Sequence, residues 1–372
     1  MSANFFGAVG LNRVSFLRED ARFINLAFNS PVAKFLVFQQ GESYIDTSVK
    51  DKITLYVGDS QKVGHVVSKL SPHLETEKLR IDNSGASVTF LGLDDKTPGF
   101  SYKEKYHGIP YFAFDFKVNE NTLIKQEDIS FLDSLERIDR NTLFSIDNYW
   151  ATLYSHAKMY LDWLGKYKYC PGCGSMIYPV HGGTKLQCSS TEDKDCSVRN
   201  ARVNNVCFPR SDPVIIIAMT NEDYSKICLA RSFRKHGDFV MYSTIAGFME
   251  PGESIENACA REIWEETGVQ CDVENVQLIS SQPWPYPANL MIGCLGVVKF
   301  NGKDELIDLG HDPELMDAQW FDTEEIRNAM EAYNGDLLVS FRDDINFPGN
   351  TAIAHHLIDH VCKQHKRRQQ KL

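Results

Sequence analysis

Three glutamates within five residues have the spacing to hold metal ions together. Glu262 is followed three and four residues later by Glu265 and Glu266. A helix carrying them would start near Ser254, a good N-cap residue, and end at Gly268, where a left-handed C-cap would fall. Side chains at these spacings share one helix face and repel one another. A merely solvated acidic face, with no basic partner four residues on, would lose stability without any offsetting gain. We therefore predict a site for Mg²⁺ or Mn²⁺, hard cations that prefer oxygen ligands.

Two charged residues flank this group. Glu253 lies in a loop that contains Gly247, Pro251 and Gly252, and Arg261 directly precedes the acidic cluster. An ion pair between Glu253 and Arg261 would tie the loop to the helix.

Four of the ten cysteines form a second candidate metal site. Cys170 and Cys173 enclose a tight Pro-Gly turn that presents two thiolates to one point, and Cys188 and Cys196 follow with seven residues between them. Zinc prefers four tetrahedral ligands in a closed site, where it stabilises the fold and takes no part in chemistry. Cys207 is the alternative fourth ligand. A redox pair at 170 and 173, with the others as surface thiols, is the alternative without zinc. We favour zinc because of the number and spacing of the ligands.

The stretch 247–269 resembles the Nudix box at every defining position. Its order is Gly, five residues, Glu, seven residues, Arg-Glu, an aliphatic, any residue, Glu-Glu, any residue, Gly and an aliphatic. The Nudix family implies an α/β/α sandwich and hydrolysis of a nucleoside diphosphate linked to another moiety. The resemblance also implies that Glu262, Glu265 and Glu266 hold the divalent ions, with the carbonyl of Ala246 as a further ligand.

A second motif narrows the resemblance to one subfamily. Residues 281–289 read Ser-Gln-Pro-Trp-Pro-Tyr-Pro-Ala-Asn, which is similar to the SQPWPFPxS array of NADH pyrophosphatases. Three prolines in five residues forbid a regular central strand, so we expect a rigid loop. From it, Trp284 and Tyr286 could stack a planar ring or pack into the core. The resemblance implies a substrate site made of Gln282, Pro283, Trp284, Pro285, Tyr286, Pro287, Ala288 and Asn289.

The resemblance adds three residues outside this array. Glu314, in the stretch 312–320, matches a Glu that is an added metal ligand, and a plain surface acid is its alternative. Phe208 corresponds to an aromatic that contacts substrate; its residue type alone would place it in the core. Ala354 takes the matching place in a segment that lines the substrate pocket.

The subfamily implies hydrolysis of NADH to reduced nicotinamide mononucleotide and AMP, with NAD and related dinucleotides as further substrates. Bound ions would lower the pKa of a water that attacks phosphorus in line, and Glu265 is the preferred acceptor of its proton. Some relatives remove NAD caps from RNA, and the box does not distinguish the two substrates because the same bond is cut. Homodimers are common in the subfamily. An inactive zinc-ribbon and Nudix binding module is the alternative of another class, which the three intact glutamates disfavour.

The elements that must position these residues predict an α+β multidomain fold. Residues 1–165 are a β-rich N-terminal domain of the NADH pyrophosphatase type, with strands at 34–38, 53–57, 87–91 and 111–116 and a helix at 147–167. Residues 166–206 are a zinc ribbon, 207–345 a Nudix α/β/α sandwich, and 346–372 a C-terminal helix and basic tail. In the sandwich we predict strands at 213–218, 227–230, 241–246, 276–282, 291–300 and 318–321 and helices at 254–267 and 323–333, with another helix at 351–366.

Composition limits the partners. The net charge of −11 argues against a wide nucleic-acid-binding face. No apolar run approaches the roughly 18 residues of a membrane span, and no signal peptide is expected. The C-terminal Gln370-Lys371-Leu372 is close to the peroxisomal Ser-Lys-Leu signal, so we expect a peroxisomal or cytoplasmic location.

Overall fold

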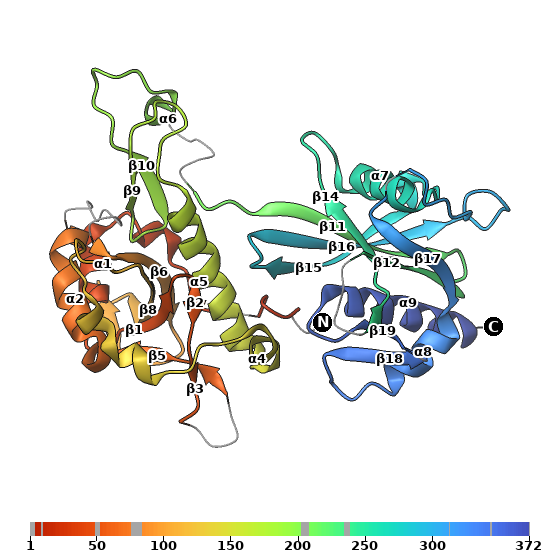
Figure 1. Cartoon of the computed structure of the whole chain (residues 1–372), viewed down its shortest axis with the longest axis horizontal. Coiled ribbons are helices and arrows are strands. Elements are labelled where there is room, and N and C mark those ends of the chain that lie inside the picture. Colours follow the sequence, from red (N-terminus) through yellow and green to blue (C-terminus); the bar gives the residue numbers. More distant parts are fainter. Residues whose placement is uncertain are drawn as a thin grey trace. The chain divides into compact units, whose positions relative to one another are not determined.

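The chain forms two compact units, one comprising Ala8–Arg210 and the other Met1–Gly7 together with Ser211–Leu372. They are drawn in the computed structural model of Figure 1. The structure describes residues 4–8, 10–48, 53–75, 84–201, 208–233, 239–311, 313–342 and 344–371. Cys207 and Leu372, which entered two of the predictions, lie outside these ranges.

The unit Ala8–Arg210 is built on a six-stranded sheet with the path β2-β1-β8-β6, to which β5 adds on β1 and β7 on β8. Strand β1 runs parallel to β8, whereas β6 is antiparallel to it. A separate two-stranded sheet joins β3 and β4. The strands are β1 (Lys34–Gln39), β2 (Glu42–Ser43), β3 (Ile45–Asp46), β4 (Thr54–Leu55), β5 (Val57–Asp59), β6 (Ala86–Asp94), β7 (Phe100–Tyr102) and β8 (Tyr106–Phe116).

Helices cover both faces of this sheet. Helices α1 and α2 pack on one face, where Phe28 and Val63 share a core with Phe35 and other aromatic residues of the strands. Helix α5 packs on the other face, where the rings of Tyr154 and Phe38 lie 5.6 Å apart. The predicted strands at 34–38, 87–91 and 111–116 and the helix at 147–167 fall on β1, β6, β8 and α5. The predicted strand at 53–57 instead covers β4 and the start of β5, which belong to different sheets, and α1 and α2 were not expected. The helices are η1 (Ser15–Leu17), α1 (Ala21–Phe28), α2 (Ser60–Glu75), η2 (Gln126–Ser134), α4 (Arg140–Ser145) and α5 (Asn148–Lys166).

The same unit ends in a small cysteine-bearing hairpin. Strands β9 (Ile177–Val180) and β10 (Lys185–Cys188) pair antiparallel and are followed by the short helix α6 (Ser197–Asn200).

The second unit contains a mixed sheet of six strands, with the path β15-β16-β11-β12-β17 and β14 paired to β11. Strands β11 and β16 are parallel and the other pairs are antiparallel. A three-stranded sheet of β13, β19 and β18 lies apart from it. The strands are β11 (Asp212–Asn221), β12 (Lys226–Ser232), β13 (Val240–Met241), β14 (Ile245–Phe248), β15 (Val276–Trp284), β16 (Asn289–Val298), β17 (Leu315–Asp322), β18 (Leu338–Arg342) and β19 (Ile345–Pro348).

Alternate residues of β11 divide this unit into two cores. Ile217 packs with Ile263 of α7 on one face of the sheet, and Ile216 packs with Leu357 of α9 on the other. Figure 1 shows α7 on one side of the sheet and α8 and α9 on the other. The helices are α7 (Ile255–Thr267), η3 (Val273–Asn275), α8 (Thr323–Glu331) and α9 (Ile353–Gln369). The C-terminal region of the chain thus has the expected helix–sheet–helix layering.

Three features of this unit differ from the expected elements. Strand β15 continues through Pro283 to Trp284, where a rigid loop was predicted; a proline is tolerated because β15 is an edge strand paired with β16 alone. The hairpin β18–β19 was not predicted. Helix α9, assigned to a separate C-terminal segment, supplies buried residues to the core of the sandwich. None of the described helices has the length and apolar character needed to cross a membrane.

Candidate functional site

Helix α7 is held at both ends by the residues expected to cap it. The Ser254 hydroxyl accepts a hydrogen bond from the N–H of Asn257 at 3.2 Å. Gly268 adopts φ 72° and its N–H donates to the carbonyl of Trp264 at 2.8 Å. Because Ile263 is fully buried against the sheet, the helix faces that carry Glu262, Glu265 and Glu266 are set by packing.

Arg261 lies among the carboxylates of the site. Its Nε and Nη2 donate to the two oxygens of Glu253 at 2.6 and 2.9 Å, so the predicted ion pair between loop and helix is present. Its Nη1 donates to Glu262 at 2.7 Å and to Glu265 at 2.8 Å. The argument that the acidic face lacks a basic partner was therefore wrong. The partner of Glu265 lies four residues before it rather than after it.

The surroundings of Glu253 and Glu262 shift their pKa values in opposite directions. Hydrogen bonds from Arg261 lower the pKa of Glu253 to about 2. Burial is the main cause that raises the pKa of Glu262, against the opposing effect of Arg261. The charges of Glu265 and Glu314 raise it further, so Glu314, just before β17, lies within electrostatic range of the cluster. Glu266 is only 5% exposed.

A glycine brings the backbone of β14 against the cluster. A Cβ atom at Gly247 would lie 2.1 Å from the carboxyl carbon of Glu262, so any other residue there would displace this carboxylate. Ala246, the predicted carbonyl ligand, is the adjacent residue of the strand and pairs with Ile216 of β11.

The donor set suits a hard cation. It combines the carboxylates of Glu262, Glu265 and Glu266 with a backbone carbonyl on β14 and a further acid at Glu314, and Mg²⁺ and Mn²⁺ prefer such oxygen ligands. Within the described residues, however, only the cysteines bring three or more side-chain donor atoms within 4.8 Å of one another. Instead, two carboxylates of α7, those of Glu262 and Glu265, accept hydrogen bonds from Arg261.

The predicted substrate array begins with a residue that is held by the protein itself. Gln282 is 1% exposed, and its Nε2 donates to the carbonyls of Phe5 and Thr351 at 3.0 and 2.8 Å. Its Oε1 accepts from the N–H of Ile353 at 2.9 Å. This side chain therefore fastens β15 to the N-terminal segment and to the start of α9.

The aromatic residues of the array are half-buried. The rings of Trp284 and Tyr286 meet edge-on at 5.9 Å, and Trp284 also meets the ring of Phe6 edge-on at 5.9 Å. Asn289 has a buried Oδ1 atom without a hydrogen-bond partner among the described residues. These residues combine a partly accessible ring surface with an unpaired acceptor.

The other members of the array occupy different surroundings, since Pro285 is buried, Pro283 and Ala288 are half-buried and Pro287 is exposed. Ala354, in the first turn of α9, is 3% exposed and belongs to the core of the unit. Phe208 belongs to the unit Ala8–Arg210, where it is 48% exposed and Lys185 Nζ lies 5.8 Å from its ring centroid.

Phe248 is a further candidate that was not predicted. It follows Gly247 at the end of β14, its ring is 58% exposed, and its carbonyl accepts a hydrogen bond from Arg261 Nη2 at 3.0 Å. A large exposed aromatic ring beside the carboxylates is suited to stacking against a planar group. Its position inside the Nudix-like stretch was the only available signal.

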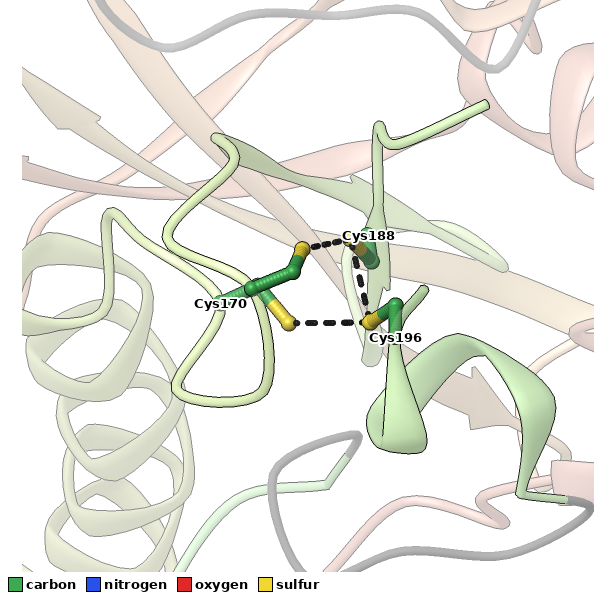
Figure 2. A group of neighbouring side chains, drawn as sticks. Cys170, Cys188 and Cys196 are labelled. Atoms are coloured by element: carbon green, nitrogen blue, oxygen red, sulfur yellow. Dashed lines mark hydrogen bonds between the residues drawn. The ribbon is translucent and has the colours of Figure 1, made fainter. Parts of the chain in front are cut away.

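The four cysteines form a compact group. Cys170 and Cys196 Sγ atoms are 3.6 Å apart, Cys173 and Cys188 are 3.5 Å apart, and Cys188 and Cys196 are 3.8 Å apart. Figure 2 shows Cys170, Cys188 and Cys196 turned toward one another from the turn, the hairpin and the residue before α6. Tetrahedral zinc with bonds of about 2.3 Å needs sulfur–sulfur distances of about 3.8 Å.

The backbone supports thiolates in this group. The N–H of Arg199 donates to Cys196 Sγ at 3.2 Å, and the N–H of Ser190 donates to Cys188 Sγ at 3.4 Å. Hydrogen bonds from Ser175 lower the pKa of Cys173 to about 5, whereas burial raises that of Cys170 to about 12. A group of four thiols with this geometry can bind a metal ion, and Cys196 completes it.

Comparisons with known proteins agree with the geometry. A family model described as the NUDIX domain matches residues 209–340. A Saccharomyces cerevisiae protein described as NAD-capped RNA hydrolase NPY1 is 52% identical over 375 residues, covering 98% of this chain and 97% of its own. A Schizosaccharomyces pombe NAD-capped RNA hydrolase is 32% identical, with 96% and 92% covered. Human NAD-capped RNA hydrolase NUDT12 is 37% identical over 211 residues, covering 56% of this chain and 41% of its own.

Proposed function

Because this chain belongs to the Nudix hydrolases, we propose that it cleaves the pyrophosphate bond of NADH and related dinucleotides, including the NAD cap of RNA. The observation that carries the proposal is that Glu262 and Glu265 of α7 share the guanidinium of Arg261 and that the Glu262 carboxylate lies against Gly247 of β14. The relatives that match nearly the whole chain are described as NAD-capped RNA hydrolases, which supports the substrate class.

The three glutamates, the Ala246 carbonyl and Glu314 would hold the divalent ions. Bound Mg²⁺ or Mn²⁺ would neutralise the pyrophosphate and lower the pKa of a water. Among the three glutamates, Glu265 has a side chain that is 39% exposed, whereas that of Glu262 is 13% exposed. Glu265 is therefore the best placed to accept the proton of the attacking water. Arg261 keeps Glu253 and the loop before α7 in position.

The planar ring of the dinucleotide would stack on aromatic side chains of the same unit. Phe248 offers an exposed ring at the end of β14, and Trp284 and Tyr286 offer half-buried rings at the end of β15. Stacking of one base on an aromatic side chain contributes about 1–3 kcal/mol. The unpaired Oδ1 of Asn289 is suited to accept a hydrogen bond from a substrate amide or hydroxyl.

The cysteine group would hold zinc. Four thiols leave no open coordination position for water, so the ion would stabilise the hairpin β9–β10 and would not enter the reaction.

Glu266→Gln tests the catalytic proposal. Loss of one metal ligand should lower kcat for NADH with Mg²⁺ by about 100-fold or more, while the isosteric side chain preserves the fold. Glu256→Gln, on the exposed first turn of the same helix, should keep wild-type turnover and serves as the matched control. Equal inactivity of the wild type and both variants would favour the inactive binding module.

Product analysis ranks the two substrates. One preparation of the zinc-loaded protein is incubated separately with NADH and with an NAD-capped oligoribonucleotide, and the two values of kcat/KM are compared. Reduced nicotinamide mononucleotide and AMP are expected from NADH, and a 5′-monophosphate end from the capped RNA. Failure to release either product with Mg²⁺ or Mn²⁺ would contradict the proposal.

A further inference from the structure

A second cluster of polar side chains lies in the unit Ala8–Arg210, where the segment that precedes α1 meets α5. The N–H of Ala8 donates to the Thr152 hydroxyl at 2.9 Å, and Arg18 Nη1 donates to the Tyr160 hydroxyl at 3.3 Å. Ala8 and Arg18 therefore contact α5 at points about two turns of the helix apart. This places Arg13 and Arg18, on either side of η1, against the same helix.

The ring of Tyr160 lies close to an arginine and a histidine. Arg18 Cζ lies 6.0 Å from the centroid of its ring. His156, one turn earlier on α5, lies with its ring centroid 5.4 Å from that of Tyr160. Burial lowers the pKa of His156 well below its ordinary value, and the charges of Arg13 and Arg18 lower it further. The two arginines are thus close enough to His156 to disfavour a positive charge on it, and its imidazole is neutral.

Several donor atoms in this cluster are buried without partners. Nε and Nη2 of Arg18 and Nε2 of His156 make no hydrogen bond to any described residue, and His156 is 9% exposed. Over the described ranges, no ion pair joins Arg13 or Arg18 to a carboxylate. Buried polar groups in proteins are normally paired, and an unpaired group calls for a bound water or ion.

Other charged side chains of this unit are paired with a side chain of opposite charge. The buried carboxylate of Asp128 is held by Lys69 at 2.7 Å, and Arg137 pairs with Glu42 at 2.6 Å. Two neighbouring arginines with no acid between them, beside a buried histidine, depart from this pattern. An anion among them would offset the repulsion and pair the free donors.

We propose that Arg13, Arg18, His156 and Tyr160 form a binding site for a phosphate group. The planar guanidinium of Arg18 keeps two N–H groups free, and such a fork matches two oxygens of a phosphate. The Tyr160 hydroxyl accepts from Arg18 and so has its own hydrogen free to donate. The neutral imidazole can donate through Nε2. Arg13 is exposed and provides the side of the site that is open to solvent.

Calorimetric titration with inorganic phosphate tests the site directly. The full-length, zinc-loaded protein is used without Mg²⁺ or Mn²⁺, so that the carboxylates of α7 repel phosphate. Wild type should bind one phosphate saturably, and Arg13→Gln and Arg18→Gln should weaken binding tenfold or more. Arg22→Gln removes the same charge from an exposed residue of α1 and should bind like the wild type.

If Arg18→Gln does not fold, Arg13→Gln carries the test, because its side chain is exposed. No saturable binding, or wild-type affinity in Arg13→Gln and Arg18→Gln, would overturn the site. The titration involves no turnover, so its result is independent of the catalytic proposal.

The phosphate could belong to an RNA chain or to a free ion or phosphomonoester, and kinetics separate these sources. If the site holds an RNA phosphodiester, Arg13→Gln raises KM for an NAD-capped oligoribonucleotide several-fold and leaves KM for NADH unchanged. If it holds a free phosphate or phosphomonoester, both KM values stay unchanged while the calorimetric affinity falls. An equal rise in both KM values would overturn the proposal, because it would indicate a general disturbance of the catalytic unit.

Discussion

Arg261 satisfies three carboxylates at once, so the charge balance around it depends on what else those carboxylates bind. A divalent ion would compete with the guanidinium for Glu262 and Glu265, which each accept one hydrogen bond from Nη1 of Arg261. Glu253 accepts two separate hydrogen bonds from it and can remain paired. The pair of Arg261 and Glu253 is therefore the constant part of the site.

The stability that this pair contributes should depend on pH in a defined window. The pKa of Glu253 falls from an ordinary value of 4.5 to about 2 in the folded chain. A lowered carboxyl pKa stabilises the fold above the unfolded value, and the contribution is lost as pH falls toward the folded value. Glu253→Gln should thus lower the free energy of unfolding at pH 6, and the difference from wild type should shrink steadily from about pH 4.5 downward. Urea denaturation in metal-free buffer measures it. A difference that does not change with pH would refute the assignment.

Gly247→Ala should damage the site without touching any carboxylate. The added methyl would lie 2.1 Å from the Glu262 carboxyl carbon and displace that ligand from β14. We expect a loss of Mn²⁺ affinity and of kcat by about 100-fold, from the loss of one metal ligand. Electron paramagnetic resonance counts bound Mn²⁺. Gly64→Ala, where nothing lies within 4 Å of the new methyl, is the control and should keep both values. Wild-type Mn²⁺ binding in Gly247→Ala would contradict the geometry.

At this scale the sequence predicts candidate site residues whose proximity follows from local spacing. Glu262, Glu265 and Glu266 follow from helix periodicity, and Cys170 and Cys173 from the turn between them. Arg18 and His156 could not be predicted, because they lie 138 residues apart and meet only in the fold. Phe248 was missed because a strand-end aromatic gives no sign of which way its ring faces.

One buried side chain links strand β15 to two other segments of its unit. Gln282 contacts both the N-terminal segment, at Phe5, and the start of α9. The motif that predicted it suggested contact with substrate, whereas its amide is fully engaged with backbone groups.

Gln282→Leu separates these two roles. Leaving three backbone groups without their partner should cost about 1–3 kcal/mol for each one that stays buried. Hydrogen exchange of the β15 and β16 amides should therefore become faster, whereas Gln277→Leu on the same strand, whose side chain is exposed, should leave it unchanged. If exchange is unaffected and KM for NADH rises, the side chain acts on substrate instead.

The elements that were not predicted are those in which tertiary packing overrides the local preference of the sequence. Helix α2 contains Gly64 and Pro72, two residues that disfavour helices, yet its apolar face closes one side of the sheet. Strand β15 passes through Pro283 because it is an edge. By contrast α5 and α7, with long periodic patterns and clear caps, were predicted within a residue or two of their observed ends.

Because the chain divides into two units, we expect loss of zinc to affect only the unit that contains the cysteine group. The cysteine group lies wholly in the unit Ala8–Arg210, and the carboxylates lie wholly in the other. Removing zinc with phenanthroline should expose the amides of β9 and β10 to hydrogen exchange while those of β11 stay protected. Loss of protection in β11 would contradict independent units.

Metal analysis identifies the fourth ligand. Cys196→Ser should lower the bound zinc well below one per chain, because its sulfur lies 3.6 and 3.8 Å from those of Cys170 and Cys188. Cys207→Ser is the matched control and should retain one zinc. Loss of zinc in Cys207→Ser but not in Cys196→Ser would make Cys207 the fourth ligand.

The catalytic unit is assembled from the two ends of the chain, since Asn4, Phe5 and Phe6 pack against β15 while some two hundred intervening residues belong elsewhere. During synthesis, the first few residues must wait for the last third of the protein before their partners exist. An expression fragment starting at Ser211 would reproduce the complete Nudix box but remove the Phe5 carbonyl from the Gln282 amide and the Phe6 ring from Trp284, so the motif alone is a poor guide to where this enzyme can be cut.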